Sequence, residues 1–231
     1  MSRSFTEIPL TPLRKAISAR MTHATQTIPH FRLVANIDVD CLLRWRTANT
    51  DGDPTKKISI NDCLIKAVAV SLVDNPALNC QLTDTAIQRF QSADISVVIA
   101  VEGGLATPVV RGAESKSVTE ISTTVKDFVE RAGRNALKLS EVSGGSFCIS
   151  NLGGYGIEQF DAIINAPQCA ILAIGRAAPQ VVADRGGEIR VATMLTCTLS
   201  VDHRAVDGAE ASKFLHSLRN VIADPERLGR V

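Results

Sequence analysis

Long apolar runs are missing from this chain of 231 residues. Hydrophobic residues make up 45% of the sequence, but no stretch approaches the roughly 18 consecutive apolar residues that a membrane-spanning helix requires. The first residues, Met1 to Phe5, also lack the apolar core of a secretory signal peptide. The sequence therefore predicts no membrane segment and no membrane partner.

Neither sign of charge dominates the chain. The 25 basic and 24 acidic residues leave a formal net charge of +1, and the basic residues form no tract. Nucleic acids and anionic membranes attract strongly basic patches. The even balance therefore predicts no nucleic-acid partner.

Closely spaced cysteine pairs are absent as well. None of the six cysteines lies within three residues of another, which excludes the Cys-x-x-Cys spacing of zinc sites, and we predict no metal. Most of them stand in apolar runs such as residues 194–199, where a free cysteine acts as a small hydrophobe rather than as a catalytic thiol. Reduced thiols of this kind predict a cytoplasmic location, or the mitochondrial matrix if the source is eukaryotic.

Helical and strand periodicities alternate along the chain. Apolar residues at helical spacing predict helices at residues 11–25, 59–72, 117–134 and after Asp207. Alternating apolar residues predict strands at 31–37, 86–90, 95–101, 107–110, 146–150, 170–174 and 193–201. No linker or repeat interrupts the pattern. We therefore expect one domain over residues 1–231, an α/β sandwich with a mixed sheet.

One of the four histidines stands apart from the others. His23 and His216 fall among polar helical neighbours, and His30, at the start of a strand, fits a core or interface residue. His203 ends an alternating strand beside Asp202, and functional groups are often presented at such strand ends. The alternative is a polar strand end, with Asp207 merely capping the next helix. The pattern alone leaves both interpretations open.

The segment around His203 also carries a resemblance to a known family. The run Asp202-His203-Arg204-Ala205-Val206-Asp207-Gly208 resembles the active-site signature of the dihydrolipoamide acyltransferases, the core components of 2-oxo-acid dehydrogenase complexes. Further blocks match that family in order, at residues 8–17, 28–31, 65–67, 76–79, 104–110, 144–153 and 164–168. The resemblance therefore covers nearly the whole chain.

This resemblance implies a chloramphenicol-acetyltransferase-like two-layer sandwich and a thiol-to-thiol acyl transfer. The acyl group, most commonly acetyl, moves between dihydrolipoamide and coenzyme A. His203 would be the general base, since an imidazole titrates near neutral pH. Ser150 would donate a hydrogen bond to the oxyanion, although it also fits a turn residue after an apolar strand. Asp207 would be a structural carboxylate held by an arginine, for which Arg14 is the first candidate and Arg20 the second.

The family's coenzyme A contacts fall on five positions of this sequence, and two have simpler explanations. The positions are Arg46, Ser59, Ser150, Asn151 and Gly175. Arg46 could bind a phosphate through its guanidinium, or be an exposed charge near Trp45. Ser59 could do no more than cap its helix.

The resemblance also implies partners. We expect a homotrimer whose active sites lie between subunits, possibly within a larger 24-mer or 60-mer core, that works with the decarboxylase and dihydrolipoamide dehydrogenase components. No lipoyl or peripheral-subunit-binding module is expected within these 231 residues, so the lipoyl group would come from a separate domain or chain. The last residues, 225–231, lack the leucine-rich ending of many relatives, which leaves assembly beyond the trimer open.

Two other functions remain as alternatives. The chain could be a non-catalytic core or docking subunit of the same complex, against which the presence of both His203 and Ser150 argues. It could instead acetylate a small hydroxylated molecule on the same fold. A serine-hydrolase triad is disfavoured because no Gly-x-Ser-x-Gly motif surrounds Ser150. Gly153–Gly156 opens no phosphate-binding helix in a βαβ unit and predicts no nucleotide site.

Overall fold

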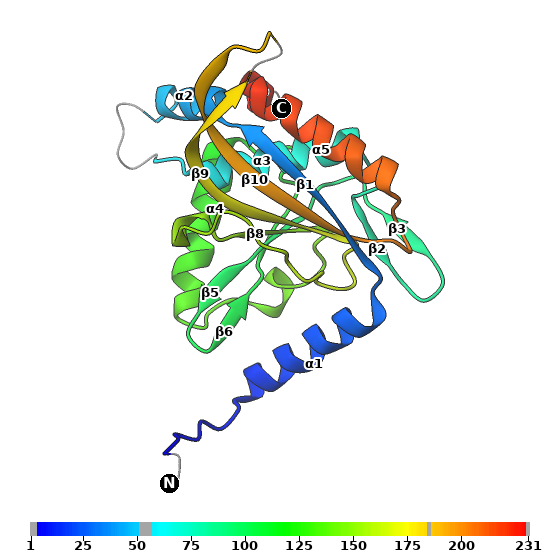
Figure 1. The fold of residues 1–231 in the computed structure, drawn as a ribbon. Coiled ribbons are helices and arrows are strands. Elements are labelled where there is room, and N and C mark those ends of the chain that lie inside the picture. The colour runs from blue at the N-terminus through cyan, green and yellow to red at the C-terminus, as the bar shows by residue number, and fades with distance from the viewer. Residues whose placement is uncertain (1–3, 51–56, 184–185, 230–231) are drawn as a thin grey trace.

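A mixed six-stranded sheet forms the centre of the computed structural model, which describes residues 4–50, 57–183 and 186–229 (Figure 1). Its strands, in spatial order, are β1 (His30–Asp38), β10 (Ile189–Asp202), β9 (Ala170–Ala183), β8 (Phe147–Asn151), β4 (Ile95–Val97) and β7 (Val109–Val110). β8 pairs parallel with β4 and β9, and the remaining pairs are antiparallel. The predicted α/β fold with a mixed sheet is confirmed.

Helices cover one face of this sheet and bury the main core against it (Figure 1). They are α2 (Asp40–Ala48), α3 (Ile60–Asp74), α4 (Val118–Gly133) and α5 (Gly208–Ala223). Two short hairpins lie outside the sheet, β2 (Cys80–Leu82) with β3 (Ile87–Arg89) and β5 (Ile99–Val101) with β6 (Gly104–Ala106). Among the described residues, no helix combines the length and the apolar character needed to cross a membrane.

Side-chain caps fix where the main helices begin. Ser59 is the N-cap of α3 and Ser117 is the N-cap of α4, each in a capping box. The serine hydroxyl accepts the backbone N–H of the acidic residue three positions later, and the carboxylate of that residue accepts the backbone N–H of the serine. Asp207 starts α5 in the same way. The predicted starts of these three helices are confirmed.

The opposite face of the sheet is covered much more thinly. Cys148, Ile171 and Ala173 point to this side and form a small second cluster with Ala24 and other residues. The long first helix, α1 (Pro12–Thr27), adds little, because Ala24 is its only buried residue. Figure 1 shows α1 projecting from the body, with the N-terminal segment at its far end.

Candidate active site

Backbone hydrogen bonds connect the end of β10, at His203, to the neighbouring segments on both sides. The N–H of His203 donates to the carbonyl of Pro29, just before β1, at 3.1 Å. The N–H of Asp202 donates to the carbonyl of Cys169, just before β9, at 2.8 Å. His203 therefore stands at a fixed point where three segments of the chain meet.

An ion pair closes the turn that follows. The carboxylate of Asp202 is only 2% exposed. Both of its oxygens accept bonds from the Arg204 guanidinium, with Nε to Oδ1 at 3.0 Å and Nη2 to Oδ2 at 2.7 Å. The carbonyl of Asp202 accepts the N–H groups of Ala205 and Val206. Asp202 therefore holds the turn, and its carboxylate is committed to Arg204.

Asp207 is committed to helix capping. Its Oδ1 accepts the N–H groups of Ala209 at 2.8 Å and Glu210 at 2.9 Å. Within one chain the structure does not bring Arg14 to Asp207: Arg14 lies on α1, and no ion pair joins the two among the described residues. Arg20, the second candidate, instead donates to the carbonyl of Ala166.

The imidazole of His203 is exposed, and its ring contacts the ring of Phe31. The two centroids lie 4.5 Å apart with the planes tilted by 45°. Among the described residues, the imidazole has no hydrogen-bond partner. Sequence reasoning missed Phe31, because its place in an alternating strand identifies it only as a residue facing the core.

Ser150 lies near the end of β8, with its hydroxyl free to donate. The residue is 9% exposed, and no described group is a hydrogen-bond partner of its side chain. The next residue, Asn151, donates from Nδ2 to Oδ1 of Asn61 on α3 at 3.0 Å and accepts the N–H of Gly153 at 2.9 Å. The strand end that carries Ser150 is therefore braced, while the hydroxyl itself remains available.

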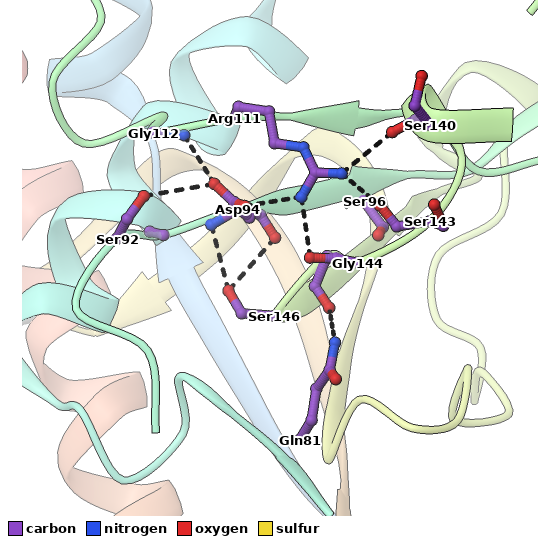
Figure 2. Close-up of polar contacts among 12 residues, drawn as sticks. Gln81, Ser92, Asp94, Ser96, Arg111, Gly112, Ser140, Ser143, Gly144 and Ser146 are labelled. Atoms are coloured by element: carbon purple, nitrogen blue, oxygen red, sulfur yellow. Dashed lines mark hydrogen bonds and ion pairs between the residues drawn. The ribbon is translucent and has the colours of Figure 1, made fainter. Parts of the chain in front are cut away.

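A polar network fixes the other end of β8 (Figure 2). Arg111 donates to a carboxylate oxygen of Asp94 at 2.8 Å and to the carbonyl of Gly144 at 2.9 Å. Gln81 donates to the carbonyl of Gly145 at 2.8 Å, and Asp94 accepts the N–H of Gly112. These bonds hold the turn that leads into the strand, so β8 enters the sheet from a rigid start.

Strand register places Ser150 and His203 far apart within one chain. Ala173 is the partner of both Ser150 on β8 and Thr198 on β10, and His203 lies five residues beyond Thr198. At about 3.3 Å per residue and about 4.8 Å per strand, their Cα atoms are separated by about 19 Å. One chain therefore cannot bring both side chains to the same reacting centre.

The two residues also belong to opposite faces of the sheet. Ser150 is two residues from Cys148, which lies in the second cluster, and so shares its face. Leu199 and Val201 lie in the main core, and His203, just after the end of β10, contacts Phe31, which packs against the same core. The two side chains are therefore separated both by distance and by the sheet itself.

Four of the five positions expected to contact coenzyme A line two clefts that share Ser59 and Ile60, and Ser150 lines neither. One cleft, of about 550 Å³, is lined by Ser59, Asn151 and Gly175 among others. The other, of about 540 Å³, is lined by Arg46 and two lysines, Lys57 and Lys126. The structure therefore brings these four positions into one continuous region.

Gly175 is required by a close backbone contact beside the first cleft. A Cβ atom at this position would lie 1.9 Å from the carbonyl oxygen of Glu158. The neighbouring Arg176 donates its N–H to the carbonyl of Ile157 at 2.7 Å. Any side chain at Gly175 would displace this segment, so the residue has a structural role whatever the cleft binds.

Three of the five buried thiols are poor nucleophiles. Burial raises the pKa of Cys148 and of Cys197 to about 12, and burial also raises the pKa of Cys63 to about 12. A thiol reacts as its thiolate, which is scarce for these three residues at neutral pH. This agrees with the interpretation of these cysteines as packing residues.

Comparison with known proteins connects this geometry to one family. The sequence profile of the 2-oxoacid dehydrogenases acyltransferase (catalytic domain) matches residues 2–230. The chain is 43% identical to the dihydrolipoyllysine-residue acetyltransferase component of the mitochondrial pyruvate dehydrogenase complex of Dictyostelium discoideum, over 98% of this chain and 36% of that protein. It is 40% identical to the corresponding protein of Rickettsia bellii, over 97% and 55%. The chain thus spans between about a third and just over half of these relatives.

Solved structures agree over almost the full chain. A probable dihydrolipoamide acetyltransferase from Listeria monocytogenes superposes with a TM-score of 0.90, at 31% identity and 95% coverage of both chains. The Azotobacter vinelandii dihydrolipoamide acetyltransferase gives a TM-score of 0.93 at 28% identity, covering 98% of this chain and 95% of that one. Chloramphenicol acetyltransferase, at 11% identity and a TM-score of 0.58, shares the fold, which confirms the predicted fold class. The chain therefore belongs to the acyltransferase (catalytic domain) family of the 2-oxoacid dehydrogenases.

Proposed function

We propose that this chain transfers an acyl group between the thiols of dihydrolipoamide and coenzyme A. His203 acts as the general base that removes the proton of the attacking thiol, and Ser150 donates a hydrogen bond to the oxyanion of the tetrahedral intermediate. The observation that carries the proposal is the pair of free functional groups. An exposed imidazole and a nearly buried, unpartnered hydroxyl stand on braced strand ends, at the positions that match the family's motifs.

The related Azotobacter vinelandii enzyme supports this assignment of roles. Its structure was investigated for the parts that a serine, a histidine and an asparagine play in the catalytic mechanism. There the histidine follows the serine by 52 residues and the asparagine follows the histidine by four. In this chain His203 follows Ser150 by 53 residues, and Asp207 follows His203 by four. Asp207 would then replace an amide with a carboxylate, and its capping of α5 favours a structural role.

Coenzyme A would lie along the two joined clefts. Arg46, Lys57 and Lys126 offer three cations for its phosphates, and the guanidinium of Arg46 can bind a phosphate through two bonds. The other cleft runs past Ser59 to Asn151, the residue next to Ser150, and Gly175 shapes its wall. A ligand in this direction would carry its thiol toward the proposed oxyanion donor.

The minimal active species would be a homotrimer. Each chain presents Ser150 and His203 on opposite faces, about 19 Å apart by strand geometry, so each site needs His203 from one subunit and Ser150 from the next. A head-to-tail contact of this kind closes into a ring when the rotation between subunits is threefold, which gives the trimer. The likeness to a solved structure of the cubic core of a pyruvate dehydrogenase multienzyme complex supports a further assembly into a 24-mer.

The remaining partners follow from the same proposal. The lipoyl group would arrive on a separate domain or chain. The decarboxylase would load it with the acyl group, and the dihydrolipoamide dehydrogenase would reoxidise the dithiol that remains after transfer. Acetyl is the acyl group we propose, because the relatives named above are acetyltransferases. We propose that this chain lies in the cytoplasm, or in the mitochondrial matrix if its source is eukaryotic, because these relatives include a mitochondrial protein.

An acceptor comparison tests the function. The purified chain is incubated with acetyl-coenzyme A and either free dihydrolipoamide or chloramphenicol, and the acylated product is separated by chromatography. We expect S-acetyl-dihydrolipoamide and no acetylated chloramphenicol. Acetylation of chloramphenicol alone would favour the small-molecule acetyltransferase, and no product with either acceptor would favour the non-catalytic core subunit. Succinyl- and branched-chain acyl-coenzyme A, tested in parallel, would measure the preference for acetyl.

A further inference from the structure

The backbone of the turn around His203 is fixed by several bonds, whereas the imidazole makes no hydrogen bond among the described residues. Hydrogen bonds from His203 to Pro29 and from Asp202 to Cys169 fix the backbone, and the Asp202–Arg204 ion pair closes the turn. The imidazole extends from this turn into solvent. Its ring packs against the ring of Phe31, and among the described residues the imidazole has no hydrogen-bond partner.

No carboxylate of the same chain orients the base. In a hydrolase triad, a carboxylate bound to the imidazole sets its orientation and tautomer. The nearest acidic residues in the sequence are Asp202 and Asp207, and both are engaged elsewhere, with Arg204 and with the start of α5. Some other group must therefore restrict the rotation of the imidazole.

We propose that Phe31 is the residue that positions the His203 imidazole for acyl transfer, through ring-to-ring packing rather than a hydrogen bond. This inference rests on the proposed function. Phe31 touches the base and acts through it, so it is a positioning residue and not a catalytic one.

Phe31 is itself well placed to remain fixed. It lies in β1 opposite Val201 of β10, so the strand that leads to His203 and the strand that carries Phe31 are directly hydrogen-bonded neighbours. Its side chain is half-buried and packs against the main core. Tilted aromatic rings at this separation attract one another beyond their shared burial. The contact therefore restrains the imidazole without using either of its nitrogens, which stay free for the thiol proton.

Loss of this restraint should slow chemistry more than binding. A small misplacement of a catalytic group can cost up to about 10²-fold in rate. We expect Phe31→Ala to lower kcat about tenfold and to leave KM for acetyl-coenzyme A within about twofold. Phe31→Tyr keeps the ring and should keep kcat within about twofold. Phe31→Leu keeps most of the apolar volume without the ring, and it serves as the second variant if Phe31→Ala does not fold.

Leu33→Ala is the matched control. Leu33 lies two residues along the same strand, on the same face, and packs half-buried against the same core. It pairs with Leu199, four residues before His203. A purely structural effect would appear equally in both alanine variants. We expect Leu33→Ala to leave kcat within about twofold.

A double-mutant cycle separates positioning from general damage. If Phe31 acts through the imidazole, Phe31→Ala should have no further effect on the residual turnover of His203→Ala. The ring protons of His203, assigned by comparison with His203→Ala, should also lose their ring-current shift in Phe31→Ala and Phe31→Leu but not in Phe31→Tyr.

Two results would overturn the role of Phe31. They are a folded Phe31→Ala chain with unchanged kcat, or an equal loss of turnover with and without His203. Either would leave the proposed function intact, provided that the wild-type chain transfers acetyl to dihydrolipoamide and His203→Ala does not. A wild-type chain without that activity would instead overturn the proposed function itself.

Discussion

At the scale of single residues, the two proposed catalytic groups share one property, the absence of a hydrogen-bond partner among the described residues. The imidazole of His203 is exposed and the hydroxyl of Ser150 is nearly buried, whereas the carboxylate of Asp202 binds Arg204 and Oδ1 of Asp207 caps α5. Groups held ready for a substrate are expected to be unpartnered in its absence.

Removing the base should nearly abolish turnover. We expect His203→Ala or His203→Asn to lower kcat by about 10²–10⁴-fold, because the attacking thiol loses its proton acceptor. Steady-state rates with acetyl-coenzyme A and dihydrolipoamide measure this effect, and thermal unfolding verifies the fold. His216→Ala is the matched control, since that residue lies on exposed α5 surface. A loss below tenfold in a folded His203 variant would contradict the mechanism.

Removing the oxyanion donor should affect the same rate without affecting binding. We expect Ser150→Ala to lower kcat by about 10²-fold, because its hydrogen bond forms mainly in the transition state. Calorimetry should show nearly unchanged coenzyme A affinity. An increase in KM with normal kcat would instead identify Ser150 as a residue that binds the ground state.

These residues were predictable from the sequence to different degrees. His203 was visible as a polar residue at the end of an alternating strand, whereas Ser150 was not distinguishable from Ser146 or Ser200 without the family resemblance. Phe31 was missed because period-two patterning reports only the face of a residue, and its contact with His203 depends on the pairing of β1 with β10. Long-range pairing is not encoded in local periodicity.

At the scale of elements, capping residues predicted where helices begin better than periodicity predicted where strands end. The caps at Ser59, Ser117 and Asp207 are local hydrogen-bond motifs and were readable in the sequence. β9 and β10 run beyond their predicted ends, to Ala183 and back to Ile189. Side chains in the outer halves of these strands are mostly exposed, as for Val181 (72% exposed) and Val191 (67% exposed). Alternation of apolar and polar residues therefore does not reveal these halves as strand.

An ion-pair network at the end of α4 provides a pH-dependent prediction. Arg131 donates to both carboxylate oxygens of Glu141 at 2.8 Å and also to Asp127. The hydrogen bonds from Arg131 lower the pKa of Glu141 from its ordinary 4.5 to about 2. A carboxyl whose pKa is lower in the folded state stabilises the fold above its unfolded pKa. This contribution is therefore present at neutral pH and disappears as the pH falls from about 4.5 to about 2.

Glu141→Gln should remove this contribution. We expect the variant to unfold at a lower urea concentration than the wild type near about pH 7, and the difference to shrink steadily below about pH 4.5. Glu130→Gln is the matched control, because Glu130 pairs with Arg134 at a site where both side chains are mostly exposed. A difference that is constant with pH would show that the charge of Glu141 is not the cause.

At the scale of the whole molecule, the thin cover on one sheet face and the split site point to the same requirement for other subunits. α1 leaves Leu13 and the segment before it, with Phe5 and Ile8, largely exposed. Ser150 and His203 lie on opposite faces, at distant points of the sheet. Neither feature was predictable from composition or periodicity, because both depend on the order of strands that are far apart in the sequence.

Subunit complementation tests this requirement directly. His203→Ala and Ser150→Ala chains are each expected to form inactive trimers. In a head-to-tail ring, any mixed trimer contains one interface where an intact His203 meets an intact Ser150. Equal amounts refolded together give three quarters mixed trimers with one working site in three, so we expect about a quarter of wild-type activity.

The control is His203→Ala refolded with the His203→Ala/Ser150→Ala double variant, which has no histidine to contribute and should stay inactive. Mass spectrometry verifies that mixed trimers have formed, and light scattering measures their size. If verified mixed trimers show no activity, or if a monodisperse wild-type monomer is active, the two residues must act within one chain, and the register that separates them would have to be wrong.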